Sequence, residues 1–162
     1  LEPQIDGETS AVEEHGLRDG IERVSLGCKS LSLLVPSEHP WAEMEMVPYD
    51  ALRNQEICTI SRAHGVLLSE TLARLLNTAQ TKYITVPEGD AIAAIRYGSL
   101  RRCPIVDIGW FPIPADLADG SLVRRPVSGW DLRTKLVMMR GQDARHPALE
   151  PFWKSGLQSE FS

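Results

Sequence analysis

The sequence predicts an α/β fold, in which helices pack against a parallel sheet. Segments typical of strands and of helices alternate between residues 56 and 110. The chain has 162 residues, 43% of them hydrophobic, which is enough for one ordinary domain or for two small lobes. In open sheets of this kind ligands bind at the carboxyl ends of the strands, so we expect the functional residues in the loops that follow them.

Three predicted strands alternate with two predicted helices in the middle of the chain. The helix predicted over 66–79 carries leucines that recur on one face, as in an amphipathic helix. Asp90 can cap the second helix, and Gly98 can close it. Strands that alternate with helices are typically parallel and joined by crossovers. The three strands are predicted over 56–61, 82–86 and 104–110.

The regions on either side are less regular. Residues 1–20 are polar and acidic without periodicity, so we expect a poorly structured or partial segment there. Pro36 cannot donate to a ladder and Pro40 keeps His39 out of a helix, so the chain should run extended across 36–41. Further predicted elements are strands over 21–26, 30–35, 121–127 and 134–140, a helical turn within 47–55, and a helix over 146–157 that Pro151 delays or kinks.

Composition and charge argue against several classes of protein. The net charge is -5 and the 17 Lys and Arg residues are scattered, unlike a chain that grips phosphates by charge alone. There is no apolar run of about 18 residues and no secretory signal pattern at the start, so we expect a cytoplasmic protein without membrane contact. The cysteines are odd in number and far apart, so we expect buried free thiols and no metal or other cofactor: Cys28, Cys58 and Cys103.

Known catalytic motifs are not found in the sequence. It has no G-x-S-x-G elbow, no H-E-x-x-H, no P-loop and no G-x-G-x-x-G after a strand. Met44 and Met46 without an adjacent Cys or His make a poor soft-metal site, so we expect them to serve packing. The histidines each adjoin Pro, Gly or Glu in predicted loops and are expected to be solvated: His15, His39, His64 and His146.

Two loops that follow predicted strands carry the candidate binding residues. In the first, the hydroxyls of Thr59 and Ser61 lie between a strand end and a helix start, where unpaired N–H groups can hold a carboxylate. An equally good interpretation is that Ser61 caps the turn and Arg62 is solvated. In the second, Trp110 can line an apolar pocket, although burial statistics favour a core aromatic. Asp107, just before it, needs a partner if it is buried.

Three stretches together resemble the effector-binding domain of LysR-type transcriptional regulators. Residues 31–42, LSLLVPSEHPWA, resemble that family's strand and Pro-x-x-His-Pro-Leu-Ala crossover, with Trp41 where leucine is usual. Residues 47–65 resemble its helical turn, strand and Ser/Arg/Gly-containing ligand loop. Residues 108–153 resemble its strand, proline turn, G-x-L-V strand, returning strand and closing helix in the same order. The resemblance covers about residues 20–155.

The chain also departs from the family pattern. The stretch over 98–110 is longer than the usual Gly-rich step, and Pro151 interrupts a helix that is normally continuous. The winged helix-turn-helix, the linker helix and the first part of subdomain one are expected to be missing from this chain. The implied organisation is a partial segment at 1–20, the rest of subdomain one at 21–35 and 134–162, and subdomain two at 36–133.

The resemblance implies a periplasmic-binding-protein type 2-like fold that senses a small molecule. A carboxylate or aromatic acid would bind between the subdomains and shift the balance between two states of a homodimer or tetramer. DNA would be contacted only through the missing N-terminal domain. The implied effector-binding residues are Thr59, Ile60, Ser61, Arg62, His64, Gly65, Trp110, Phe111 and Pro112. The implied hinge residues are Val35, Pro36, Leu136 and Val137, with His39 at the hinge exit.

Two other classes of function remain open from the sequence. A solute-binding module of the periplasmic type shares this two-lobed fold, and a signal peptide upstream of Leu1 would favour it. A helix-turn-helix upstream would favour the regulator. An enzyme is the least favoured class, because no pairing of a nucleophile with a base is suggested.

Overall fold

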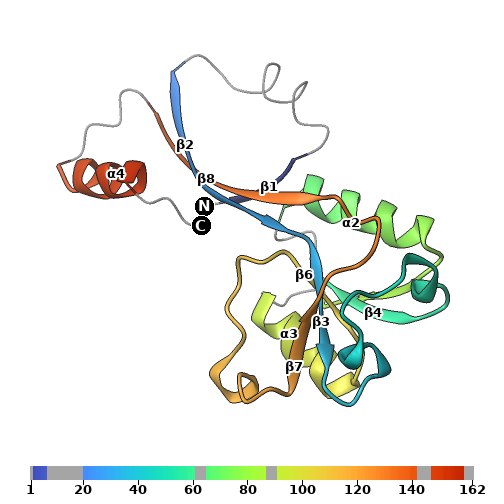
Figure 1. Cartoon of the computed structure of the whole chain (residues 1–162). Coiled ribbons are helices and arrows are strands. Elements are labelled where there is room, and N and C mark those ends of the chain that lie inside the picture. Colours follow the sequence, from blue (N-terminus) through green and yellow to red (C-terminus); the bar gives the residue numbers. More distant parts are fainter. Residues whose placement is uncertain (1, 7–19, 61–64, 87–90, 142–146, 159–162) are drawn as a thin grey trace. The chain divides into compact units, whose positions relative to one another are not determined.

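The computed structural model describes residues 2–6, 20–60, 65–86, 91–141 and 147–158. The chain divides into two compact units, drawn in Figure 1. Unit 2 is continuous, whereas unit 1 combines the two ends of the chain. None of the helices in the described ranges is long and apolar enough to cross a membrane. Unit 1 consists of Leu1–Ser30 and Leu132–Ser162, and unit 2 of Leu31–Asp131.

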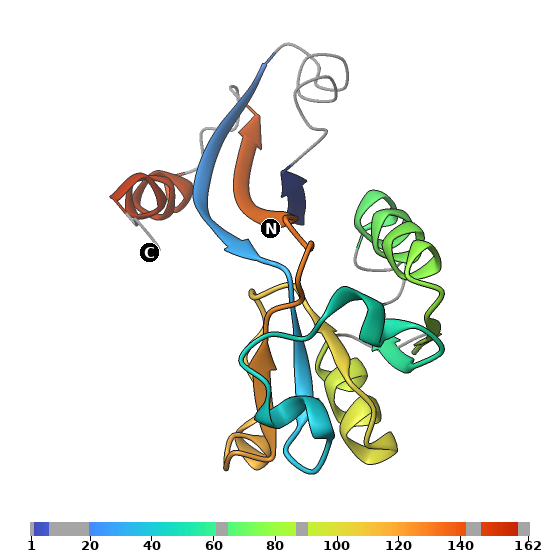
Figure 2. The same ribbon diagram turned by 45° about the vertical axis from the view of Figure 1, so that its right-hand side comes forward.

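Unit 2 contains a five-stranded sheet with the strand order β5-β4-β6-β3-β7. β4 is parallel to β5 and β6, because α2 and α3 supply the crossovers that parallel strands need. β3 lies antiparallel to both β6 and β7, and its pairing with β7 can be followed in Figure 2. The α/β class is therefore confirmed, and the sheet is mixed. Its strands are β3 (Ser32–Pro36), β4 (Glu56–Thr59), β5 (Lys82–Thr85), β6 (Ile105–Asp107) and β7 (Leu122–Arg125).

The helices of unit 2 pack on this sheet through apolar faces. α2 spans Val66–Thr78 and buries Leu68, Leu72 and Leu76, as the leucine spacing predicted. In the described ranges, short 3₁₀ helices lie in two of the connections between strands, two of them between β3 and β4 and one between β6 and β7. The remaining helical elements are η1 (Pro40–Glu43), η2 (Tyr49–Leu52), α3 (Ala91–Arg101) and η4 (Ala115–Leu117).

α3 continues through Gly98, so the prediction that this glycine ends the helix was wrong. A Cβ atom at Gly98 would lie 2.2 Å from Cγ1 of Ile105 and 3.2 Å from Cβ of Cys58. Glycine therefore allows close approach of α3 to the sheet. The helix ends at Arg101, and Arg102 takes a left-handed conformation with a φ of 54°.

The chain does not run extended across residues 36–41, as the two prolines suggested. Pro36 belongs to β3 at a position where that strand pairs only with β7. Pro40 is the first residue of η1, where its missing N–H is not needed. His39 caps this helix, because the N–H of Trp41 donates to its Nδ1 at 3.2 Å. The prediction was wrong because proline restricts a strand end or a helix start less than an interior.

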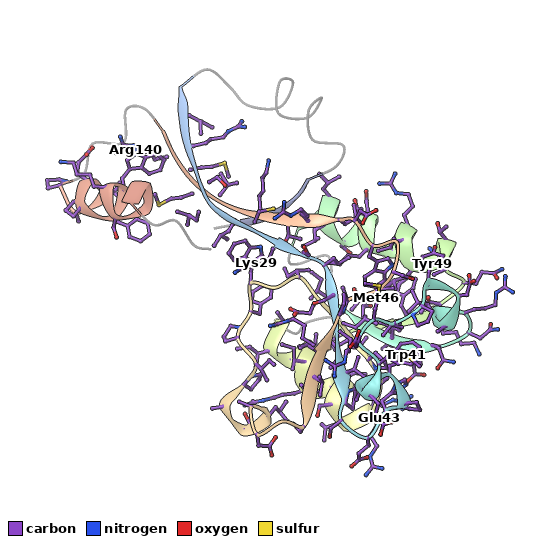
Figure 3. The ribbon with its side chains drawn as sticks, in the orientation of Figure 1. Lys29, Trp41, Glu43, Met46, Tyr49 and Arg140 are labelled. Atoms are coloured by element: carbon purple, nitrogen blue, oxygen red, sulfur yellow. The ribbon has the colours of Figure 1, made fainter. Side chains whose placement is uncertain are left out.

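Unit 1 contains an antiparallel sheet with the strand order β1-β8-β2, covered by α4. Leu26 and Met138 of the sheet form a small core with Trp153 of α4. Arg140 lies beside the helix in Figure 3, with its Cζ 4.4 Å from the centroid of the Trp153 ring. Its Nη1 is 2.9 Å from Oε1 of Glu150. The elements are β1 (Glu2–Asp6), β2 (Ile21–Ser30), β8 (Arg133–Gly141) and α4 (Leu149–Gln158).

Two features of unit 1 extend or correct the sequence predictions. Residues 2–6, part of a segment expected to be poorly structured or partial, form β1, for which β8 supplies a hydrogen-bonding partner. The short segment shows no strand alternation of its own, so its pattern could not reveal this. Pro151 lies in the first turn of α4, which begins at Leu149, so the helix starts late as one of the two alternatives proposed.

The chain crosses between the units at Ser30–Leu31 and again at Asp131–Leu132. The sequence placed these boundaries a few residues further along the chain, and the assignment of the units to effector subdomains stays a prediction. Residues inside strands have their backbone angles held by the ladder. The predicted hinge residues lie in such positions, with Val35 and Pro36 in β3 and Leu136 and Val137 in β8.

Candidate effector site

The candidate site is the edge of the unit 2 sheet at which β4, β5 and β6 end. β4 pairs in parallel with both β5 and β6, so the three strands run in the same direction and their last residues lie at one edge of the sheet. Those residues are Thr59, Thr85 and Asp107. α2 and α3 each follow one of these strands and therefore begin at the same edge. Their first N–H groups have no partner within the helix and carry partial positive charge there.

The first predicted loop leaves β4 at this edge. Thr59 and Ile60 are both buried, each with 3% of its surface exposed. Gly65 is the N-cap of α2, with a φ of 121°, and makes no side-chain capping bond. The helix start therefore leaves its N–H groups without a cap from that residue. The other predicted residues of this loop lie outside the described ranges: Ser61, Arg62 and His64.

The second predicted loop leaves β6 at the same edge. Trp110 and Phe111 are partly buried and Pro112 is exposed. The remaining tryptophans of the chain are each at most 6% exposed, so Trp110 differs from them. Gly109 turns the chain with a φ of 79°, a conformation that glycine adopts readily. The structure thus brings the described residues of the two predicted loops to one edge of one unit.

Thr59 carries an unusual polar atom. Its Oγ1 is buried and has no hydrogen-bond partner, a state shared among the described side chains only with Nε1 of Trp130. A buried hydroxyl without a partner costs about 1–3 kcal/mol, so such a group calls for a partner such as an ordered water, an ion or a ligand. This hydroxyl lies at the end of β4, where ligands of open α/β sheets bind.

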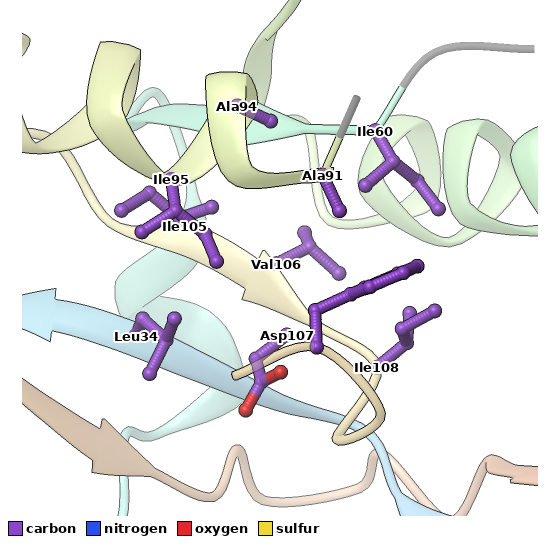
Figure 4. A pocket seen from close by; sticks show the side chains of 10 residues that line it. Leu34, Ile60, Ala91, Ala94, Ile95, Ile105, Val106, Asp107 and Ile108 are labelled. Carbon is purple, nitrogen blue, oxygen red and sulfur yellow. The ribbon is translucent and has the colours of Figure 1, made fainter. Parts of the chain in front are cut away.

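A small cavity lies beneath the start of α3 at this edge (Figure 4). Its volume of about 10 Å³ corresponds to room for about one water molecule. Phe111 and Ile60 bring the two predicted loops to the same cavity wall. The lining is apolar except for Asp107: Leu34, Ile60, Ala91, Ala94, Ile95, Ile105, Val106, Asp107, Ile108 and Phe111.

Asp107 is buried and fully partnered, which resolves the question that the sequence left open. It is 4% exposed. Its Oδ1 accepts the N–H of Gly109 at 2.8 Å, and its Oδ2 accepts from Ser32 Oγ at 3.3 Å and from Arg124 Nε. In the sequence, the need for such partners was indicated only by a single carboxylate within an apolar strand. The partners Ser32 and Arg124 could not be found from the sequence, since they come from strands whose register was unknown.

Within the described ranges, no group of three His, Cys, Asp or Glu side chains that could hold a metal ion occurs. Burial raises the pKa of Cys58 to about 12, and burial also raises the pKa of Cys103. Both thiols are therefore held protonated and unreactive near neutral pH. Burial lowers the pKa of His39, which serves as a helix cap.

A comparison with known protein families identifies the kind of domain that this chain forms. The family model of the LysR substrate-binding domain matches residues 11–159. The chain belongs to the LysR substrate-binding domain family. It is thus an effector-binding domain of the LysR type, as the three motifs predicted. No curated protein sequence matches it significantly.

Solved structures of LysR-type regulatory domains share the fold. The reduced OxyR regulatory domain from Pseudomonas aeruginosa has a TM-score of 0.60 and 14% identity, over 90% of this chain and 68% of that one. The CcmR regulatory domain from Synechocystis PCC6803, in complex with 2-PG, has a TM-score of 0.64 and 12% identity, over 99% and 74%. The BenM effector-binding domain with its effector benzoate has a TM-score of 0.61 and 15% identity, over 88% and 64%. The LysR-type chain therefore spans 64–74% of these domains.

Proposed function

We propose that this LysR-type domain senses a small carboxylate, bound at the edge of the unit 2 sheet where β4 and β6 end. The whole regulator would work in the cytoplasm as a homo-oligomer and contact DNA through a separate domain. Ligand binding would change the angles at the crossings Ser30–Leu31 and Asp131–Leu132, which we propose as the hinge in place of positions inside strands. The family match favours this regulator over a solute-binding module for transport.

The observation that carries the proposal is the unpartnered hydroxyl of Thr59. It is buried at the strand end, so a ligand oxygen would supply the missing hydrogen bond. The hydroxyl can donate to a carboxylate, and a charge-assisted bond of this kind is stronger than a bond between neutral groups.

The surrounding backbone supports an anion in preference to a neutral ligand. α2 has 13 residues and begins at this edge. Helix starts attract negative charge, and Gly65 offers no side chain to occupy the N–H groups of α2. The BenM domain was solved with its effector benzoate, an acid, and the CcmR domain in complex with 2-PG. A small acid is therefore the first choice of ligand.

The size of the cavity limits where such a ligand would lie. A volume of about 10 Å³ cannot hold an aromatic ring, so the enclosed space beneath α3 is not the binding pocket itself. Thr59 is not among the residues that line this space, so a ligand would reach its hydroxyl from outside the cavity, at the end of β4.

The experiment is a thermal-shift screen of small aliphatic and aromatic carboxylates, benzoate among them, with the matching neutral amides as controls. A ligand at about 100 times its Kd stabilises the folded state by about 2.7 kcal/mol, which is readily detected. The decisive variant is Thr59→Val, which keeps the shape and removes the hydroxyl. We expect it to be at least as stable as the wild type, because a buried unpaired group is lost, and to lose the ligand shift.

Thr81→Val is the matched control. Thr81, which directly precedes β5, is also buried in unit 2. Its Oγ1, unlike that of Thr59, has a partner and donates to the carbonyl of Leu52 at 3.4 Å. The control should lose about 1 kcal/mol of stability and keep the ligand shift. A shift that survives in Thr59→Val, or a screen in which amides act as well as acids, would count against the proposed site.

A further inference from the structure

A half-buried charge pair lies behind the turn that carries Trp110 and Phe111. Asp107 and Ser32 are paired in the ladder, as are Leu34 and Arg124, so their side chains share one face of the sheet. Arg124 reaches across β3 to the Asp107 carboxylate. The carboxylate is 3% exposed and the arginine side chain 51%, so one end of the pair is buried and the other is in solvent.

Burying a carboxylate at the end of an apolar strand is costly unless every oxygen is partnered. Apolar residues fill the neighbouring positions Ile105, Val106 and Ile108, which are all buried. Both oxygens of Asp107 are partnered, and a partnered buried charge adds little stability compared with an apolar side chain, so the contacts of the carboxylate indicate its role. Its Oδ1 has one partner in the structure, the N–H of Gly109, two residues further on. An Asp side chain that accepts from the backbone two residues later fixes the direction of a turn.

We propose that Asp107, paired with Arg124, is a positioning residue for the effector site. The carboxylate holds the turn at Gly109 and so places Phe111 against the cavity that Ile60 also lines. Arg124 balances the carboxylate charge, so that the edge does not repel an anion. The inference rests on the proposed function only in taking this turn as part of the effector site.

The positioning role is tested without any effector, by hydrogen exchange of backbone amides across residues 108–112. Asp107→Ala removes the acceptor of the Gly109 N–H, and we expect exchange in this segment to rise about tenfold or more. Asp107→Asn keeps an oxygen acceptor and should restore most of the protection. Exchange in β3, measured in the same samples, separates local opening from general loss of stability. If Asp107→Ala does not fold, the test uses Asp107→Asn alone. The proposal then requires the Gly109 amide of Asp107→Asn to exchange at the same rate as in the wild type.

The charge role is tested by fluorescence quenching with iodide, an anion, and with neutral acrylamide. Trp110 is the least buried tryptophan, so the quenched signal comes mainly from this turn, and Trp110→Phe should remove it. At low salt the ratio of iodide to acrylamide quenching should fall about twofold in Arg124→Gln and rise about as much in Asp107→Asn. Added salt should remove both effects.

The matched controls are Arg101→Gln and Glu56→Gln. This pair has the same kind of contact, at 2.9 Å, and Arg101 has the same 51% exposure as Arg124. It lies at the opposite edge of the sheet, where β4 begins and α3 ends. We expect both controls to leave the quenching ratio and the exchange across 108–112 unchanged. The proposal is overturned if they move the ratio as much as Arg124→Gln does, or if Asp107→Ala exchanges like the wild type. Neither assay uses an effector, so a failed ligand screen leaves both results interpretable.

Discussion

Replacing Gly98 by alanine is the most direct test of how α3 packs on the sheet. In an exposed helix this change stabilises the protein by about 1 kcal/mol, because alanine is the better helix former. Here the new Cβ would lie 2.2 Å from Cγ1 and 2.9 Å from Cδ1 of Ile105, where ordinary contacts between carbon atoms are about 3.5 Å or longer. Ile105 is 1% exposed, so moving it would displace other atoms of the close-packed core.

Overpacking of a dense core costs about 1–3 kcal/mol and sometimes more. This cost outweighs the gain in helix propensity, so we expect Gly98→Ala to lose about 1–2 kcal/mol. The melting temperature should fall by roughly 2–8 °C for a chain of this length. Urea unfolding and a thermal melt measure both quantities. Ser99→Ala on the same helix is the control and should change stability by less than about 0.5 kcal/mol.

A double-mutant cycle identifies the clash as the cause. Ile105→Ala alone should cost about 2–5 kcal/mol, because it leaves a cavity. Combined with Gly98→Ala, the alanine Cβ occupies part of that cavity, so the double variant should be more stable than the sum of the two losses by about 1–3 kcal/mol. If Gly98→Ala stabilises the protein, or if the two losses simply add, then the close approach of α3 to β6 is not what requires glycine.

Three further outcomes follow from one buried and two half-buried side chains. Burial raises the pKa of Cys58 to about 12, against about 9 in the unfolded chain, so the folded state holds the thiol proton more tightly. Above pH 9 the free energy of unfolding of the wild type should therefore fall by about 1 kcal/mol per pH unit relative to that of Cys58→Ala. Urea unfolding of both proteins at about pH 8 and about pH 10 measures this difference. Because burial lowers the pKa of His39, the folded state favours the neutral ring, and stability should fall as the pH drops below about 6.5; His39→Asn, which can still accept from Trp41, should lack this fall in melts at different pH. Arg140→Met should weaken the packing of Trp153 by about 1 kcal/mol, seen as faster amide exchange in α4, and unchanged exchange would refute a contribution from the ring contact.

The elements that the sequence predicted well are those whose pattern and packing agree. The leucine spacing of α2 needs no knowledge of its neighbours, because one face of the helix is apolar wherever the sheet lies. β1 shows the opposite case, since its five residues form a strand only through pairing with β8. Gly98 was misjudged because a glycine that ends a helix and one that permits close packing look the same in sequence, and only the 2.2 Å distance to Ile105 separates them.

The candidate site was predictable to the level of its loops. Strand ends followed by hydroxyl, glycine and aromatic residues pointed to Thr59 and Trp110, because parallel strands end at one edge. The unpartnered state of Thr59 Oγ1 and the partners of Asp107 depend on register and on side-chain packing. Arg124 is 17 residues from Asp107 and meets it across β3, which no spacing rule predicts.

The two ends of unit 2 have a consequence for the order of folding. Its first and last strands, β3 and β7, are neighbours, so this unit brings its own entry and exit together when it folds. β2 and β8 must close a loop of about a hundred residues to pair Ser30 with Arg133, which costs about 4 kcal/mol of chain entropy for a flexible loop. Once unit 2 has folded, the pairing of β3 with β7 already holds its two ends close together, so most of this loss of chain entropy has occurred before β2 and β8 pair. The segment Leu31–Asp131 is thus an insertion that can acquire its structure first and template the sheet into which it is inserted.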